Sequence, residues 1–340
     1  MTSPSTDVVT RLRGEGLALR RDDLLPPDQP YKPYPPLHRW RYNAGLRALM
    51  FFGLAVGFSL LVGLLVGLVV AGTSGTDAIA AVATRWSGVI GIPAFLSAYL
   101  LLTTWIEQRR PPHELAPRRA GRGLLLGLGL GAVLQLLCVG LLAAFGAFRI
   151  HGVDASYNPV WALATAGFGA AINEEILFRG ILFRLVEDTF GTWVSIVVSA
   201  LVFGLAHLGN AEATLQGALA IALEAGVLFA VLYALTRSLW VLMGLHFAWN
   251  VIQGPLLGIV VSGSSEGGQG YLRSTLEGPA WLAGGGFGME ASVVTVAVLT
   301  ALAVWLMVQL HRRGLAVAPF WVRRRAASTV DRTVGGAKTV

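Results

Sequence analysis

The sequence is poor in cysteine and in charge. Cys138 is the only cysteine, so an intramolecular disulfide is excluded and no thiolate metal site is indicated. Charged residues make up 13% of the 340 residues, far below the ~25% typical of soluble domains. Hydrophobic residues make up 54%. This composition predicts a membrane protein.

The N-terminal region has no apolar stretch of signal-peptide length and carries a cluster of prolines between 26 and 36. We predict that residues 1–45 form a Pro-rich cytoplasmic tail, residues 46–311 a transmembrane helical domain, and residues 312–340 a basic cytoplasmic tail. The net charge of +7 is concentrated in short clusters beside apolar runs. Such clusters orient a chain in a lipid bilayer and give no reason to expect a nucleic-acid partner.

Eight apolar runs are long enough, or nearly so, to cross a bilayer, which takes about 20 residues each. We place them at 48–71, 89–106, 123–148, 160–185, 192–208, 214–235, 239–257 and 291–310. The second run is short and is expected to extend back toward Ile79. The sequence therefore predicts an all-α, polytopic integral membrane protein of about eight transmembrane helices.

The distribution of arginine supports this count and sets an orientation. With eight spans and the N-terminus inside, the outer loops keep only Arg85, Arg149 and Arg273. Nearly all other cations then lie on the cytoplasmic side, as the positive-inside rule requires. We predict a multi-pass protein of the cell (inner or plasma) membrane with both termini in the cytoplasm.

The fourth run carries Glu174, Glu175 and Arg179. On a helix Glu175 and Arg179 are four residues apart and can pair, whereas Glu174 is turned about 100° away and can face another neighbour. Ionisable groups inside a bilayer cost roughly 2.5–3.5 kcal/mol each on insertion scales. A functional site explains this expense better than a charged helix end snorkelling to water.

Two further polar motifs lie in other spans. Phe203 and His207 form Phe-x-x-x-His near the outer end of the fifth span, and His246 and Asn250 share one face of the seventh. Either motif alone also fits a packed polar residue or a hydrogen bond between helices. A rise of 1.5 Å per residue places Glu174 about 17 Å, Asn250 about 16 Å and His246 about 10 Å from the inner helix ends. We therefore expect one intramembrane pocket that opens to the cytoplasm.

These side chains suit hydrolysis. A buried carboxylate can take a proton from water, and imidazole and amide groups can stabilise an oxyanion. The same set could bind Zn²⁺ through Glu174, His207 and His246, leaving one position open for water. The sequence does not separate the two mechanisms, although the His-Glu-x-x-His motif is absent.

The motifs resemble those of the CPBP intramembrane proteases, which include type II CAAX prenyl endopeptidases and bacterial Abi proteins. They stand here as Glu174-Glu175-Ile-Leu-Phe-Arg179, Phe203-Gly-Leu-Ala-His207 and His246-Phe-Ala-Trp-Asn250. The resemblance covers a protease-like core at about 160–253.

The resemblance implies that Glu174 is the water-activating base, aided by His207, and that His246 and Asn250 stabilise the transition state. It implies a supporting role for Glu175 and Arg179. The family is commonly labelled a metalloprotease, and a glutamate-dependent mechanism without metal is also argued for it.

Glu224 and Phe203 are candidates for a second layer around the site. Glu224 could equally make a structural hydrogen bond or pair with Arg237. The sequence thus predicts an intramembrane endopeptidase acting on a membrane-associated or C-terminal peptide segment, without a firm cofactor. The alternatives are a non-catalytic membrane immunity or scaffold protein and a proton-coupled transporter, since membrane Glu and His side chains also form proton relays.

Overall fold

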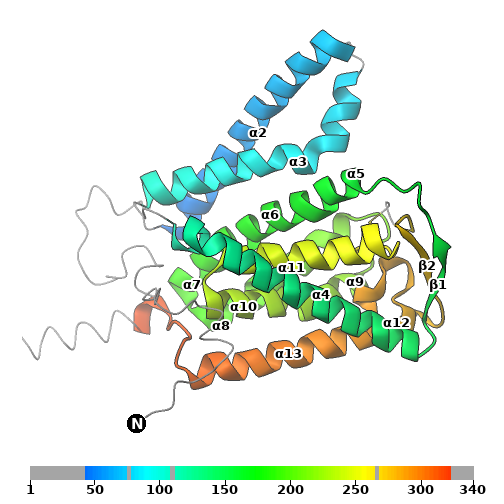
Figure 1. Cartoon of the computed structure of the whole chain (residues 1–340). Coiled ribbons are helices and arrows are strands. Elements are labelled where there is room, and N and C mark those ends of the chain that lie inside the picture. Colours follow the sequence, from blue (N-terminus) through cyan, green and yellow to red (C-terminus); the bar gives the residue numbers. More distant parts are fainter. Residues whose placement is uncertain (1–42, 75–77, 108–111, 265–267, 323–340) are drawn as a thin grey trace, which may run out of the picture.

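The computed structural model describes residues 43–74, 78–107, 112–264 and 268–322. Most of the predicted N-terminal tail and more than half of the predicted C-terminal tail lie outside these residues. The described part is built almost entirely from long helices (Figure 1). Six of them are long and apolar enough to cross a membrane. They are Ala44–Ser74, Gly88–Ile106, Pro117–Ala144, Thr192–Gly209, Leu215–Thr236 and Val293–Arg312.

Two further helical stretches correspond to the remaining predicted spans. One runs from α5 (Val160–Ala162) through α6 (Ala170–Glu174) to α7 (Arg184–Phe190), and the other is α11 (Leu239–Val251), continued to Leu256. Both stretches carry polar side chains that lower their mean hydropathy, so they are not among the six helices named above. The helical, membrane-spanning fold is as predicted, whereas the count of eight spans is not confirmed, because six helices among the described residues are long and apolar enough to cross a membrane.

The other elements follow the predicted order. They are α2 (Ala44–Ser74), α3 (Ala78–Leu101), α4 (Ala120–Ala144), α8 (Thr192–Ala206), α9 (Leu215–Ile221), α10 (Val227–Thr236), α12 (Ala280–Ala283) and α13 (Val293–Arg312). Helix α3 begins at Ala78, so the helix that carries the second span does extend back past Ile79.

A short sheet is the one departure from an all-helical chain that the described residues show. Strands β1 (Phe148–Val153) and β2 (Leu272–Leu276) pair antiparallel, with an irregularity between Ile150 and Gly152. They lie together at one end of the helical bundle (Figure 1). We call this the sheet end. The apolar pattern of the sequence predicts loops or helix ends in both segments.

The opposite end of the bundle is the basic end, where α4 begins and where α7, α10 and α13 finish. It holds buried ion pairs: Arg184 to Glu107 at 2.8 Å, Arg47 to the same carboxylate at 3.3 Å, and Arg237 to Glu187. These arginines are fully or almost fully buried. Each pair links residues that are far apart in the chain, so the pairs hold different helices together at this end.

Helices α4 and α11 pack closely at the centre of the bundle. A Cβ on Gly127 would lie 2.0 Å from the carbonyl oxygen of Val241, and one on Gly244 would lie 2.5 Å from that of Leu124. Small residues at such positions let backbones approach where side chains would hold them apart. The contact fixes α11, which carries His246 and Asn250, against the rest of the core.

Candidate active site

The two glutamates sit where the helix geometry changes. Helix α6 ends at Glu174, and the next nine residues, Glu175–Phe183, form a π-helical segment. Such wider turns are frequent at functional sites because they redirect side chains. Just upstream, the amide nitrogen of Asn173 donates to the carbonyl oxygen of Gly88 at 2.8 Å, which ties this helix to α3.

Glu175 is the centre of a buried polar network. Its Oε1 accepts hydrogen bonds from Arg179 at 3.1 Å and from Nδ1 of His246 at 2.9 Å. The Glu175 and Arg179 side chains are completely buried and His246 is 7% exposed. The ion pair expected from the i, i+4 spacing therefore forms. The contact to His246 joins two of the motifs and was not anticipated.

Arg179 is also enclosed by aromatic rings. Its guanidinium carbon lies 4.4 Å from the ring centre of Phe203 and 5.1 Å from that of Phe229. It donates a further hydrogen bond to the carbonyl oxygen of Gly226 at 3.4 Å. Cation–π contacts of this kind gain strength when they are desolvated. The arrangement holds the charge of Arg179 behind Glu175, out of the cavity.

Glu174 has different surroundings. Its side chain is 30% exposed, and its Oε2 lies 3.9 Å from Nε2 of His246. That oxygen is buried and has no hydrogen-bond partner among the described residues. The Glu174 carboxylate thus lies near Nε2 of His246, whereas Glu175 accepts a hydrogen bond from Nδ1 of the same ring.

His207 and Asn250 are each held by a backbone carbonyl. His207 follows α8, and its Nδ1–H donates to the carbonyl oxygen of Phe203 at 2.7 Å. The side-chain nitrogen of Asn250 donates to the carbonyl oxygen of Ala166 at 2.9 Å, using one of its two hydrogens. The Phe-x-x-x-His spacing therefore gives a local contact between Nδ1 of His207 and the Phe203 carbonyl, and Nε2 of His207 takes no part in this contact.

A cavity of about 380 Å³ brings all four predicted catalytic residues to one surface. It is lined by Thr165, Ala166, Ala170, Glu174, Phe178, Ala206, His207, Asn210, His246, Asn250, Val261, Ser262 and Ser264. Apart from the helix faces, the lining comes from residues after α8 and after α11, which lie toward the sheet end. This differs from the expected opening, because in the predicted topology the sheet end faces away from the cytoplasm.

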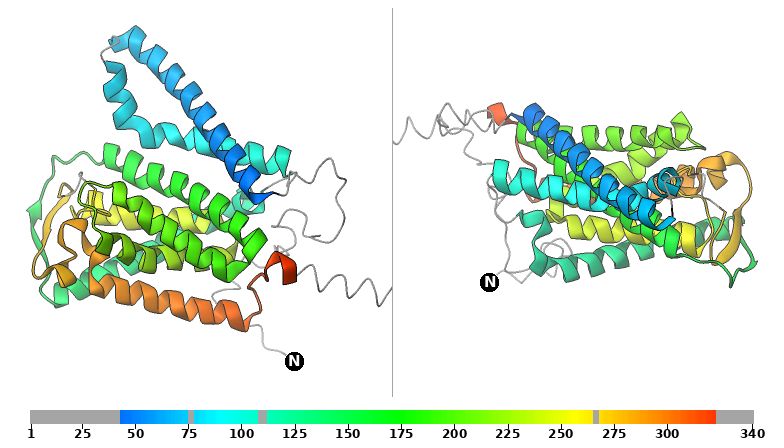
Figure 2. Two further views of the ribbon diagram at one scale, coloured as in Figure 1. Left: turned by 180° about the vertical axis from the view of Figure 1, so that it is seen from behind. Right: turned by 90° about the horizontal axis from the view of Figure 1, so that it is seen from above.

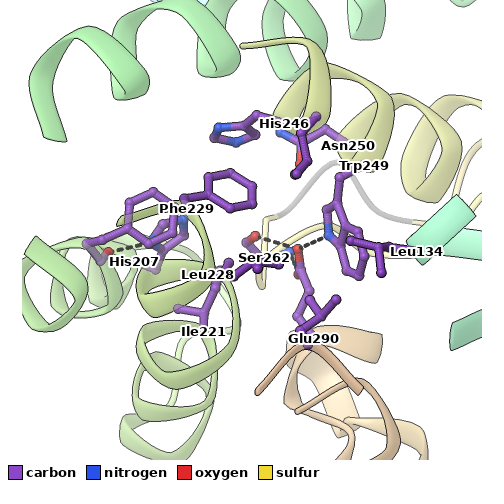
Figure 3. Close-up of a pocket in the computed structure, with 14 residues that line it drawn as sticks. Leu134, His207, Ile221, Leu228, Phe229, His246, Trp249, Asn250, Ser262 and Glu290 are labelled. Carbon is purple, nitrogen blue, oxygen red and sulfur yellow. Dashed lines mark hydrogen bonds between the residues drawn. The ribbon is translucent and has the colours of Figure 1, made fainter. Parts of the chain in front are cut away.

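A second, smaller cavity of about 20 Å³ lies deeper, between His207, His246 and Asn250 on one side and Glu290 on the other (Figure 3). This volume matches a single water molecule, and the lining supplies several polar partners for one. The smaller cavity extends the site into the protein.

Glu290 is a member of the site that the sequence motifs do not reveal. It is 2% exposed, and its carboxylate accepts hydrogen bonds from the indole nitrogen of Trp249 at 3.1 Å and from both the hydroxyl and the backbone amide of Ser262 (Figure 3). Burial raises the pKa of the Glu290 carboxyl, although these hydrogen bonds oppose the effect. No spacing motif marks this glutamate, because it follows a glycine-rich loop far along the chain.

Ser262 has a left-handed backbone conformation, with φ of 49°. A non-glycine residue adopts it at a cost of roughly 1–2 kcal/mol. Its carbonyl oxygen accepts a 2.6 Å hydrogen bond from the side chain of Asn210, three residues after His207. Glu290 and Ser262 thus connect the turn that carries His207 to α11.

Glu224 lies outside both cavity linings. It is completely buried, and neither carboxylate oxygen has a hydrogen-bond partner among the described residues. Glu290 lies close enough to interact with it electrostatically. The alternative pairing with Arg237 does not form, because Arg237 bonds to Glu187 through two nitrogens.

The described residues do not fit a zinc site. No three His, Cys, Asp or Glu side chains in this part of the chain lie close enough together to hold a metal ion. The Nδ1 contacts of His246 to Glu175 and of His207 to the Phe203 carbonyl leave Nε2 of both rings available and do not bear on this result, because metal-bound histidines commonly make such contacts. Glu174, His207 and His246 thus share a cavity without converging on one point.

Comparison with known proteins identifies the same region. No curated protein and no solved structure matches the chain. The sequence model of the family described as type II CAAX prenyl endopeptidase Rce1-like matches residues 156–252, which hold all three motifs. Together with the apolar helices, this match supports a multi-pass membrane protein of protease type. Residues 156–252 are therefore similar to the type II CAAX prenyl endopeptidase Rce1-like family.

Proposed function

We propose that the protein is an intramembrane endopeptidase in which Glu174 activates water without help from a metal. The observation that carries this proposal is the cavity of about 380 Å³ shared by Glu174, His207, His246 and Asn250. A carboxylate and two imidazoles that line one cavity are groups that peptide hydrolysis can use.

Each residue has a distinct part in the proposed reaction. Glu174 takes a proton from water as the oxygen attacks the peptide carbonyl, and His207 orients that water. The second amide hydrogen of Asn250 stabilises the oxyanion, together with Nε2 of His246 when that ring is protonated. The carbon–nitrogen bond then breaks as the proton passes to the leaving amine.

Glu175 and Arg179 act behind this set. Glu175 fixes the ring orientation of His246 through Nδ1 and keeps Nε2 turned toward Glu174. Arg179 compensates the buried charge of Glu175. A carboxylate that holds an imidazole in one tautomer is a recurring device in hydrolytic sites.

The alternatives fit the geometry less well. A transporter needs a path that reaches both sides of the membrane, whereas the cavity lining comes from the sheet end and buried ion pairs close the basic end. A non-catalytic immunity or scaffold protein has no need to hold Glu174, both histidines and Asn250 around one cavity. We further propose that the protein lies in the cell membrane with both termini in the cytoplasm.

The test is cleavage of a peptide library by the purified protein in lipid nanodiscs. We expect Glu174→Gln to lower kcat at least 100-fold, in line with the loss of a general base, while the thermal unfolding midpoint stays within a few degrees. Glu277→Gln, at an exposed carboxylate, is the matched control. Equal turnover by Glu174→Gln and the unmodified protein would remove the proposed function.

A further inference from the structure

We infer that the site works from the non-cytoplasmic side of the membrane and acts on an uncharged stretch within an extracytoplasmic peptide, not on a free C-terminal carboxylate. This inference rests on the proposed function for the reaction, but its first experiment does not depend on any activity. Three observations carry it: the charge of the two bundle ends, the location of the cavity, and the chemistry of its lining.

The two ends of the bundle differ in cationic residues. Arg47, Arg119, Arg184, Arg237 and Arg312 all lie at helix ends on the basic side, with further arginines on either side of them in the sequence. Among the described side chains, the sheet end has Arg149 and Arg273 in its strands. A bias this strong places the basic end in the cytoplasm.

The cavity lies toward the other end. Thr165 lies five residues after Val160, where the helical stretch of α5, α6 and α7 begins at the sheet end. Asn210 follows the end of α8. Val261, Ser262 and Ser264 belong to the segment between α11 and β2. The connections that leave the bundle at the sheet end therefore form part of the cavity wall. At the basic end, Arg184 and Arg237 are buried in ion pairs with Glu107 and Glu187.

The lining also restricts the substrate. No lysine or arginine is among the described residues that line the cavity, and Arg179 stays behind Glu175. A free terminal carboxylate bound there would meet the like charge of Glu174 and would have only the imidazoles of His207 and His246 as partners, and burying a poorly paired charge is costly. Hydroxyl and amide groups on Thr165, Asn210 and Ser264 suit the backbone of an internal, uncharged peptide segment.

The first experiment maps which side reaches the cavity by cysteine labelling. Cys138→Ala removes the only native thiol, and single cysteines replace Ser264 in the cavity lining, Ser156 in an exposed sheet-end loop, and Gly121 at the basic end. A Cβ at Gly121 meets nothing within 4 Å, so that position tolerates the change. If Ser264→Cys fails to accumulate, Ala206→Cys replaces it, because Ala206 lines the same cavity.

We expect a membrane-impermeant maleimide to label Ser264→Cys and Ser156→Cys in intact cells, and Gly121→Cys only after permeabilisation. Labelling of Ser264→Cys only after permeabilisation would overturn the inference, as would labelling of Gly121→Cys in intact cells. These outcomes leave the proposed hydrolysis untouched, since Glu174→Gln tests that separately.

The second experiment compares matched peptides with free and amidated C-termini, using a sequence that the unmodified protein cleaves. We expect kcat/KM for the two forms to agree within about threefold. A preference above tenfold for the free carboxylate would contradict the inferred substrate class while leaving the endopeptidase activity established.

Discussion

Glu174 and Glu175 are adjacent in the sequence but have different surroundings. Glu175 is completely buried and accepts hydrogen bonds from Arg179 and His246, whereas Glu174 lines the cavity. Helical geometry predicts this division, because adjacent residues point about 100° apart. The amino-acid sequence is therefore enough to assign the two glutamates to different neighbours.

Other residues of the site could not be found in this way. Glu290, Ser262 and Asn210 meet the motif residues only through tertiary contacts, from loops whose paths no local periodicity specifies. The Glu175–His246 hydrogen bond likewise joins residues 71 positions apart. Motif spacing identifies groups on one helix face, but the identity of the facing element depends on how the helices pack.

At Ser262, we expect the backbone conformation and Glu290 to be energetically coupled. Glu290→Gln leaves donors of Ser262 and Trp249 poorly paired, so it should lower the free energy of unfolding by about 1–3 kcal/mol and reduce kcat. Ser262→Gly should lessen this effect in the double variant, because glycine adopts a positive φ without strain. Thermal unfolding and kcat of the two single variants and the double variant check this.

A control for this cycle is Glu290→Gln combined with Ser156→Gly, in an exposed loop that does not touch Glu290. If Glu290→Gln lowers stability and kcat equally whether residue 262 is serine or glycine, the Glu290 carboxylate does not act through Ser262.

At the scale of elements, the helices were predicted within a few residues, because long apolar runs bounded by charge leave little choice. The break in helix geometry at Glu175–Phe183 was not predicted, since nothing in the apolar pattern distinguishes a π-helical segment from an α-helix. The pairing of β1 with β2 was also missed, because paired residues are at least 119 positions apart in sequence and lie in segments predicted as loops or helix ends.

The contact of α4 with α11 should be intolerant of even one methyl group. We expect Gly127→Ala to lower the free energy of unfolding by about 1–3 kcal/mol, because the new Cβ would meet the Val241 carbonyl oxygen. Gly129→Ala is the matched control, since a Cβ there meets nothing within 4 Å. Unfolding midpoints that move equally for the two variants would argue against close packing here.

On the scale of the whole molecule, α2 and α3 form a hairpin that leans away from the remaining helices (Figure 2). Only 6% of the most apolar 18-residue stretch of α2 is buried inside the protein. At its basic end α2 is held by Arg47, which bonds to Glu107 at 3.3 Å and to Asp188 at 2.5 Å. The hairpin is therefore joined to α7 mainly through one end.

We expect Arg47→Met to loosen this joint, because breaking a buried ion pair from one side costs about 3–5 kcal/mol. The unfolding midpoint should fall, and amide hydrogen exchange should rise in the first turns of α2. Arg118→Met, at an exposed arginine of the same end, should change neither measurement. Unchanged exchange in α2 of the Arg47 variant would show that contacts other than this ion pair hold the hairpin.

One aromatic ring on the helical stretch that carries Glu174 lines two different cavities. Phe178 lines the cavity with Glu174, and it also lines an apolar cavity of about 320 Å³ between α2 and α7. Detergent tails that enter the second space would press on the wall of the first. Rates measured in micelles should therefore depend on the surfactant chosen, and assays in a bilayer give the sounder comparison between variants.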